Sequence, residues 1–308
     1  MLGATQQVEA ELGNGIPAGT THVAFATVPR PGKTNNEDLV AAVGSAAWVL
    51  DGSSVPPGLP SCCDRDAGWY VGRLSAGIAA ALADQAIDLP PAVAAAISSV
   101  TAEHEAACPA GKARSVLGPS ATVALVRRRG NALDYLLLGD TALLLETDQG
   151  VTHQSDRRLA QIAPDLRERL RVHLRNGGGY LSPRYREMLA SLVETERALR
   201  NAEDGYWIAS NDPTAAYHSV TGSRSIGTGP GEVRRFALLS DGFERTVAVF
   251  GLYASWADLM AALVRDGPAK CLAALRAAET ADPHGRRFPR TAASDDASAL
   301  VSQAGPLL

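Results

Sequence analysis

Acidic residues stand at the ends of apolar segments throughout this sequence of 308 residues. Asp51 closes the apolar run 46–50 and is followed by glycine, and Asp241 follows the run 236–239 and is again followed by glycine. A single Asp-Gly pair is most simply a turn. Its repetition, together with other acids in turns or beside strands, predicts a shared site. The acidic residues in this set are Glu37, Asp38, Asp51, Asp140, Asp241 and Asp295.

These carboxylates indicate a metal site. A buried carboxylate is unstable unless a cation or hydrogen bonds compensate its charge, and a divalent ion is the usual compensation. No histidine or cysteine accompanies the aspartates, so the all-oxygen set favours Mg²⁺ or Mn²⁺ over zinc. Because glycine lets the backbone approach closely, we expect the Gly52 carbonyl to reach a metal ion or its water. The sequence contains neither a Gly-x-Ser-x-Gly motif nor a P-loop.

The composition argues against a nucleic-acid-binding protein and against a membrane protein. A formal net charge of -4 argues against a basic nucleic-acid-binding face. No apolar run reaches the ~18 residues of a membrane helix, and the first residues show no signal peptide. Four cysteines without a Cys-x-x-Cys pair fit a reduced protein. We therefore expect a cytoplasmic protein with neither nucleic-acid nor membrane partners.

The apolar periodicity predicts strands in two groups and pairs of helices. Tight hairpins are expected at Gly44–Ser45 and at Gly139–Asp140, and a charged helical segment from 155 to about 203 is interpreted as an insertion. The pattern fits two mainly antiparallel sheets covered by helices, an α+β sandwich. Residues 1–18 are expected to form a flexible tail and residues 19–308 one domain. Strands are predicted near 21–28, 39–43, 46–50, 121–126, 133–138, 141–146, 205–209, 233–239 and 297–301, and helices near 67–88, 91–107, 254–266 and 268–280.

The order of the acidic motifs resembles that of the bacterial PP2C-type (PPM family) metal-dependent serine/threonine protein phosphatases, over roughly residues 21–302. No single motif is specific, and it is their number and order that carry the resemblance. The matches are Lys33, Glu37 and Asp38 for Arg-x-x-x-Glu-Asp; Val49, Asp51 and Gly52 for Val-x-Asp-Gly; Gly118, Ser120, Ala121 and Thr122 for Gly-Ser-Thr-Ala; Gly139, Asp140 and Thr141 for Gly-Asp-Ser; Leu239, Ser240, Asp241 and Gly242 for Leu-x-Ser-Asp-Gly; and Asp295, Asp296 and Ser298 for Asp-Asn-x-Thr.

The resemblance implies a four-layer α-β-β-α sandwich whose site holds two or three Mg²⁺ or Mn²⁺ ions. The segment from about 155 to 230 matches the family's flap, which borders the active site. The resemblance implies that Asp51 bridges two metal ions and that Asp241 and Asp295 complete the coordination of the first ion. The Gly52 carbonyl would bind the second ion, with Glu37 holding it through water and Asp38 in support. Asp140 and Asp241 would form a weaker third metal site.

Two departures from the family pattern affect the chemistry. Lys33 replaces the arginine that grips the substrate phosphate. It remains the expected phosphate-binding residue and, with Asp51, a catalytic one, but it lacks the bidentate fork of arginine. Arg30 is a candidate to assist it. Ser53 and Ser54 follow Gly52 where many members have His/Met-Gly-Gly, so the histidine that would protonate the leaving alcohol is absent; His153 and His218 are the candidates to replace it.

The leading hypothesis is a metal-dependent phosphoric monoester hydrolase that acts on phosphoserine and phosphothreonine in proteins by attack of a metal-bridging hydroxide. Two alternatives remain open: a phosphatase of the same fold that acts on a small phosphorylated metabolite, and a non-catalytic regulatory module that retains the fold. The expected partner is accordingly a phosphorylated protein or a small phosphoester.

Overall fold

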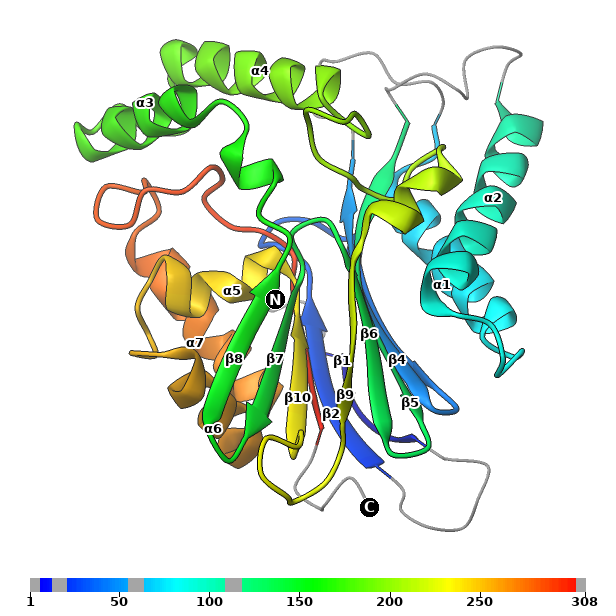
Figure 1. Cartoon of the computed structure of the whole chain (residues 1–308). Coiled ribbons are helices and arrows are strands. Elements are labelled where there is room, and N and C mark those ends of the chain that lie inside the picture. Colours follow the sequence, from blue (N-terminus) through cyan, green and yellow to red (C-terminus); the bar gives the residue numbers. More distant parts are fainter. Residues whose placement is uncertain (1–5, 13–20, 55–63, 109–117, 303–308) are drawn as a thin grey trace.

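The structure, a computed structural model, describes residues 6–12, 21–54, 64–108 and 118–302 of the chain. Two antiparallel sheets stack face to face between two groups of helices (Figure 1). The predicted four-layer α-β-β-α sandwich is confirmed. One sheet has the order β1 (Gln6–Leu12), β2 (Thr21–Val28), β11 (Ala297–Ser302), β10 (Arg235–Leu239), β7 (Ala142–Thr147), β8 (Gly150–Ser155); the other has the order β3 (Asp38–Val43), β4 (Ala46–Ser53), β5 (Ser120–Arg129), β6 (Ala132–Leu138), β9 (Val220–Ser225).

The helices form the outer layers. α1 (Ala67–Ala81) and α2 (Leu89–Ala107) cover the five-stranded sheet, whereas α5 (Asp241–Ala248), α6 (Trp256–Asp266) and α7 (Pro268–Ala281) cover the six-stranded sheet. Short 3-10 helices span Leu159–Gln161 and Pro213–His218. Within the described residues, no helix combines the length and the hydrophobicity that crossing a bilayer requires.

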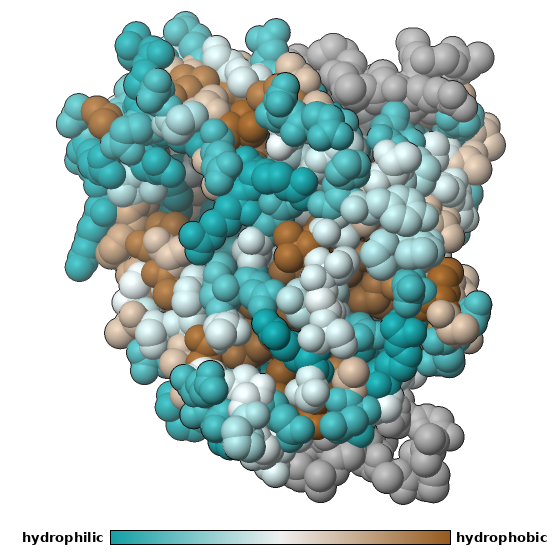
Figure 2. All heavy atoms as spheres, in the orientation of Figure 1, coloured by the Kyte–Doolittle hydropathy of each residue, from teal (hydrophilic) through white to brown (hydrophobic). Residues whose placement is uncertain are grey.

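An insertion between β8 and β9 carries α3 (Pro164–Arg175) and α4 (Pro183–Ala198), which lie over the upper ends of the sheets in Figure 1. Leu170, Leu174, Tyr185, Met188 and Leu192 give it a small apolar cluster of its own. The surface over these two helices is mainly hydrophilic (Figure 2), as their charged sequence predicts.

β4 is apolar at successive positions because both of its faces are buried. Trp48 and Leu50 pack against α1 and α2, whereas Ala47 and Val49 face the other sheet. Side chains alternate between the two faces of a strand, and here both faces are buried. Asp51 is the next residue on the face of Ala47 and Val49, so its carboxylate extends the row that points between the sheets.

The row between the sheets turns polar at the same end of several strands. In each case a polar residue lies on the same face, two positions before or after an apolar one. The pairs are Val49 and Asp51, Ala124 and Thr122, Phe25 and Thr27, Leu238 and Ser240, and Leu300 and Ser298. The apolar layer between the sheets therefore ends in a polar region, and this is where the acidic motifs meet.

Four predictions about chain path differ from the structure. Residues 205–209 form no strand and take part only in isolated bridges at Tyr206 and Ala209. Gly139–Asp140 is not a hairpin, because β6 and β7 belong to different sheets and the chain crosses between them there. Within the expected tail, Gln6–Leu12 forms β1 and pairs with β2, while residues 1–5 and 13–18 lie outside the described part. The expected flap, about 155–230, is too long at its end, since Val220–Ser225 forms β9 and pairs with β6.

The Asp-Gly motifs have a packing reason. A Cβ atom on Gly52 would lie 2.5 Å from the carbonyl oxygen of Glu37, and one on Gly242 would overlap the carbonyl oxygen of Asp296. Each glycine thus lets a strand end lie directly against the backbone of another acidic segment. The Gly52 amide also donates to the Glu37 carbonyl at 3.1 Å.

We expect Gly242→Ala to lower the free energy of unfolding by about 2 kcal/mol, because the added methyl group meets a backbone carbonyl that cannot rotate away. Urea unfolding measures the loss. Gly72→Ala is the matched control: Gly72 is exposed on α1 with nothing near its Cβ position, so alanine there should add up to about 1 kcal/mol. Equal stability of Gly242→Ala and the wild type would contradict this packing.

Candidate metal centre

A cavity of about 220 Å³ opens at the polar end of the layer between the sheets. Its acidic wall consists of Asp51, Asp140, Asp241 and Asp295. They come from the end of β4, the β6–β7 crossing, the start of α5 and the segment before β11. The side chains of Asp241 and Asp295 are 39% and 37% exposed, so solvent ions can reach this wall. Residues from α4 and the following loop, including Glu196, Arg197 and Arg200, also line the cavity.

Asp38 lies directly behind this wall. It is the cross-strand partner of Asp51 in the β3–β4 ladder and is only 6% exposed. Its two carboxylate oxygens have no well-oriented hydrogen-bond partner within the described residues. Burial raises the pKa of Asp38 well above its usual value; nearby Asp296 raises it further, and the Ser298 and Ser240 hydroxyls offset only part of the shift.

Burial and neighbouring carboxylates raise the pKa values of three wall residues, Asp51, Asp140 and Asp241. Burial raises the pKa of Asp51 well above its usual value, and neighbouring carboxylates, Asp38 first, raise it further. Burial, with the charge of Asp241, raises the pKa of Asp140 to about 8. The pKa of Asp241 is raised by burial and by Asp295. Each carboxylate therefore disfavours the ionisation of its neighbours.

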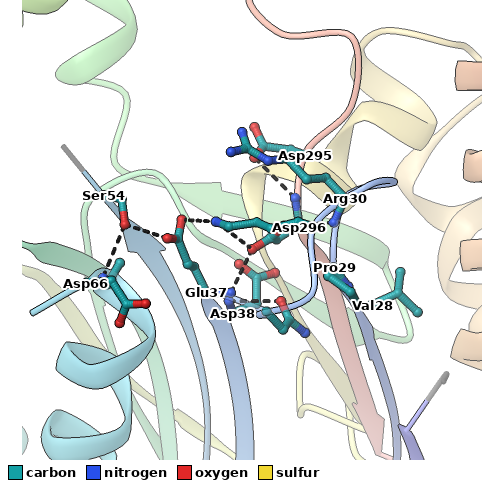
Figure 3. A network of polar contacts seen from close by, with 12 residues as sticks. Val28, Pro29, Arg30, Glu37, Asp38, Ser54, Asp66, Asp295 and Asp296 are labelled. Atoms are coloured by element: carbon teal, nitrogen blue, oxygen red, sulfur yellow. Dashed lines mark hydrogen bonds and ion pairs between the residues drawn. The ribbon is translucent and has the colours of Figure 1, made fainter. Parts of the chain in front are cut away.

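Asp296 holds the loop that carries Glu37 (Figure 3). Its carboxylate accepts hydrogen bonds from the backbone amides of Arg30 at 2.8 Å and Glu37 at 2.7 Å. The Ser54 hydroxyl, which lines the cavity, donates to the Glu37 carboxylate. Glu37 is therefore connected to the cavity through Ser54 rather than being part of its lining.

Lys33 does not belong to the cavity lining. Its ammonium lies 2.5 Å from Glu37 Oε2 and 3.9 Å from Asp296 Oδ2. The i, i+4 spacing of Lys33 and Glu37 is a recognisable ion-pair signal. Phosphate binding by Lys33 stays a prediction, and it would require the ammonium to be shared with these carboxylates.

Arg245 is a site residue that the acidic motifs did not reveal. It is 6% exposed, and its Nη2 lies 2.6 Å from Asp295 Oδ2 and 3.9 Å from Asp241 Oδ2. Burial lowers the pKa of Arg245, but the charges of Asp295 and Asp241 outweigh this and leave it raised, so the guanidinium remains charged. The signal in the sequence is its position four residues after Asp241, which places both on one face of α5.

Negative charge exceeds positive charge across this region. The acidic side chains are Glu37, Asp38, Asp51, Asp140, Asp241, Asp295 and Asp296, which makes seven, whereas the ion pairs they form within the described residues come from two cations, Lys33 and Arg245.

The donor set fits Mg²⁺ or Mn²⁺. These ions take oxygen ligands, and the wall offers carboxylates with excess negative charge together with the unpartnered oxygens of Asp38. Within the described segments, no three His, Cys, Asp or Glu side chains converge closely enough to hold a metal ion as they stand. Binding would therefore require small side-chain rotations, including one that frees Asp295 Oδ2 from Arg245.

The candidate histidines are engaged elsewhere. His153 hydrogen-bonds Glu244 and stacks on Trp256 with ring centroids 4.2 Å apart. His218 stacks on Trp207 at 3.5 Å. Neither residue lines the cavity, so leaving-group protonation by either stays a prediction without geometric support.

A cysteine nucleophile is a poorer candidate than the acidic wall. Cys108 and Arg114 are separated by five residues, a spacing that would allow a guanidinium to hold an anion beside a thiolate. However, Cys108 is buried at the C-terminal end of α2, where the helix dipole disfavours a thiolate. It does not line the cavity, and Arg114 lies outside the described residues.

Comparison with solved structures identifies the fold. The serine/threonine phosphatase PstP/Ppp of Mycobacterium tuberculosis matches with a TM-score of 0.50 and 18% identity, over 91% of this chain and 97% of that chain. A bacterial serine phosphatase matches with a TM-score of 0.51 and 12% identity, over 91% and 96% of the two chains. A single-residue variant of a bacterial serine phosphatase reaches a TM-score of 0.53 at 10% identity, with the same coverage.

The resemblance to PP2C-type phosphatases is thus confirmed at the level of the fold, which this chain shares along most of its length. Comparisons of the sequence with models of protein families and with curated proteins find no match.

The metal-free protein should lose stability as the pH rises. A carboxyl group whose pKa is higher in the folded chain than in the unfolded chain binds its proton more tightly when folded, so stability falls between the two pKa values. For Asp140 this range runs from about 4, the unfolded value, to about 8. We expect the melting temperature in EDTA to fall between pH 5.5 and pH 8, and Mn²⁺ to raise it more at pH 8 than at pH 5.5.

Asp140→Asn is the matched variant for this experiment, because it removes one titrating group while nearly preserving its shape. The pH dependence in EDTA should become shallower in this variant. A metal-free wild type whose melting temperature rises steadily from pH 5.5 to pH 8 would contradict the proposed charge excess.

Proposed function

We propose that this chain is a metal-dependent phosphatase that hydrolyses phosphate monoesters, with phosphoserine and phosphothreonine in proteins as its substrates. The observation that carries the proposal is the excess of carboxylates around one cavity, in a fold shared with serine/threonine phosphatases. A non-catalytic protein would have no use for so many uncompensated acids in one place, because each reduces its stability at neutral pH.

The residues of the acidic wall would hold the metal ions. We assign Asp51, Asp241 and Asp295 to one ion and Asp51 with the Gly52 carbonyl to a second, supported by Glu37 and Asp38; Asp140 with Asp241 would serve a third. When bound, Mg²⁺ or Mn²⁺ would lower the pKa of a water molecule and offset negative charge on the phosphoryl group.

Other residues of the chain would position these metal ligands. Asp296 fixes the Glu37 loop through the two backbone amides it accepts from. Arg245, which is buried, pairs with the Asp295 carboxylate and would release its Oδ2 to an ion. Ser54 holds the Glu37 carboxylate toward the cavity. The contacts of Asp296 and Ser54 reduce the freedom of Glu37 before an ion arrives, which favours binding.

The size of the cavity is compatible with a phosphorylated side chain as the substrate. At ~30 Å³ for each water molecule, 220 Å³ corresponds to roughly seven waters. This volume has room for a phosphoryl group and the first atoms of its ester, so the rest of a substrate would remain outside. A phosphoserine that projects from a protein surface meets this requirement.

We expect Asp51→Asn and Asp241→Asn each to lower the turnover of p-nitrophenyl phosphate and of a phosphothreonine peptide by at least about a hundredfold in Mn²⁺, because each removes a charge that the metal set needs. EDTA should abolish wild-type turnover. Asp204→Asn is the control, since Asp204 is exposed in the turn after α4 and outside the cavity lining.

Full activity of Asp51→Asn would contradict the proposal. Mn²⁺ binding by a wild type that turns over no ester would instead favour the non-catalytic alternative. A panel that compares phosphopeptides with sugar and nucleotide phosphates tests the substrate class; preference for a small metabolite would overturn the protein-substrate assignment.

A further inference from the structure

The cavity has a second, basic wall that the acidic motifs do not explain. Arg197 lies in the last turn of α4 and Arg200 follows the helix, and both line the cavity together with Glu196. The acidic wall comes from the sheets and α5, whereas the basic wall comes from the insertion between β8 and β9. Groups of opposite charge thus line one cavity from two independent parts of the fold.

The positive charge of Arg197 remains on the basic wall after internal pairing. Arg167 Nη2 lies 2.5 Å from Glu196 Oε1, and Arg167 also donates to the backbone carbonyls of Ile162 and Leu159. Glu196 is therefore neutralised by a neighbour on α3. Glu196 also interacts with the charge of Arg200 but forms no ion pair with Arg197 within the described residues.

Arg197 lacks a partner for its charge. Its guanidinium forms no hydrogen bond or ion pair within the described residues, although the residue is half-buried. Arg200 reaches the Tyr206 hydroxyl at 3.4 Å and the Gly118 carbonyl at 3.5 Å, both at the long end of hydrogen bonding. Burial and the like charge of Arg200 lower the pKa of Arg197.

A structural role explains only part of this arrangement. A basic residue in the last turn of a helix interacts favourably with the helix dipole, which accounts for a single exposed arginine on α4. It does not account for two adjacent guanidiniums that line the same cavity and repel each other. An anion in the cavity would relieve that repulsion.

We propose that Arg197, with Arg200 beside it, binds the phosphate dianion of the substrate. The inference rests on the proposed function, since it assigns the substrate-binding wall of the same cavity. Guanidinium groups bind phosphate oxygens through paired hydrogen bonds. Arg197 thereby takes the task that Lys33 cannot perform while its ammonium pairs with Glu37.

The test measures phosphate binding directly. Calorimetry compares the binding of inorganic phosphate to the Mn²⁺-loaded full chain in the wild type and in Arg197→Gln. Steady-state kinetics on p-nitrophenyl phosphate then show whether the substitution changes KM or kcat. We expect Arg197→Gln to weaken phosphate binding by about tenfold to a hundredfold, with a matching rise in KM. Arg197→Lys should recover part of the affinity, because it restores the charge but not the fork.

Arg186→Gln is the matched control. Arg186 is an exposed arginine on the same helix and is not part of the cavity lining. Equal phosphate affinity of Arg197→Gln and Arg186→Gln would overturn the inference even if the wild type is an active phosphatase, and so would a wild type that binds no phosphate. Binding that depends on Arg197 in a protein without turnover would support the inference and overturn the proposed function.

Discussion

The structure depends on one constraint: seven carboxylates share the polar end of the layer between two sheets, where two cations pair with them. Such a region is unstable at neutral pH without further positive charge, because burial and neighbouring carboxylates raise the pKa values of Asp38, Asp51 and Asp241. The fold tolerates this cost because the remaining layers are apolar and closely packed on both faces of each sheet.

Backbone contacts, rather than the acidic side chains themselves, bring the carboxylates together. Gly52 and Gly242 let the segments around Glu37 and Asp296 approach directly, and Asp296 then ties the Glu37 loop to β11 through two amide hydrogen bonds. These contacts join strands from both sheets at one end of the sandwich. Backbone contacts thus hold the acidic wall together despite the repulsion among its carboxylates. Binding of a cation then requires side-chain rotations but no rearrangement of the backbone.

Local sequence predicted the strands that end in aspartate, because burial on both faces makes a run such as 46–50 continuously apolar and alternation then places Asp51 between the sheets. The local sequence does not show which sheet a strand joins. The crossing at Gly139–Asp140 arises because β6 pairs with β5 in one sheet and β7 pairs with β10 in the other. The spacing of Lys33 and Glu37 could have revealed their ion pair. The contact of Arg245 with Asp295 depends on the position of β11, and the contribution of Arg197 to the cavity depends on how α4 docks.

The most direct test of the central claim is anomalous diffraction from crystals soaked in Mn²⁺, since it locates the ions independently of any activity. We predict manganese peaks in the cavity with Asp51 among the ligands, accompanied by rotation of the Asp295 carboxylate away from Arg245. Crystals that diffract well after the soak but show no manganese beside Asp51 would contradict the account.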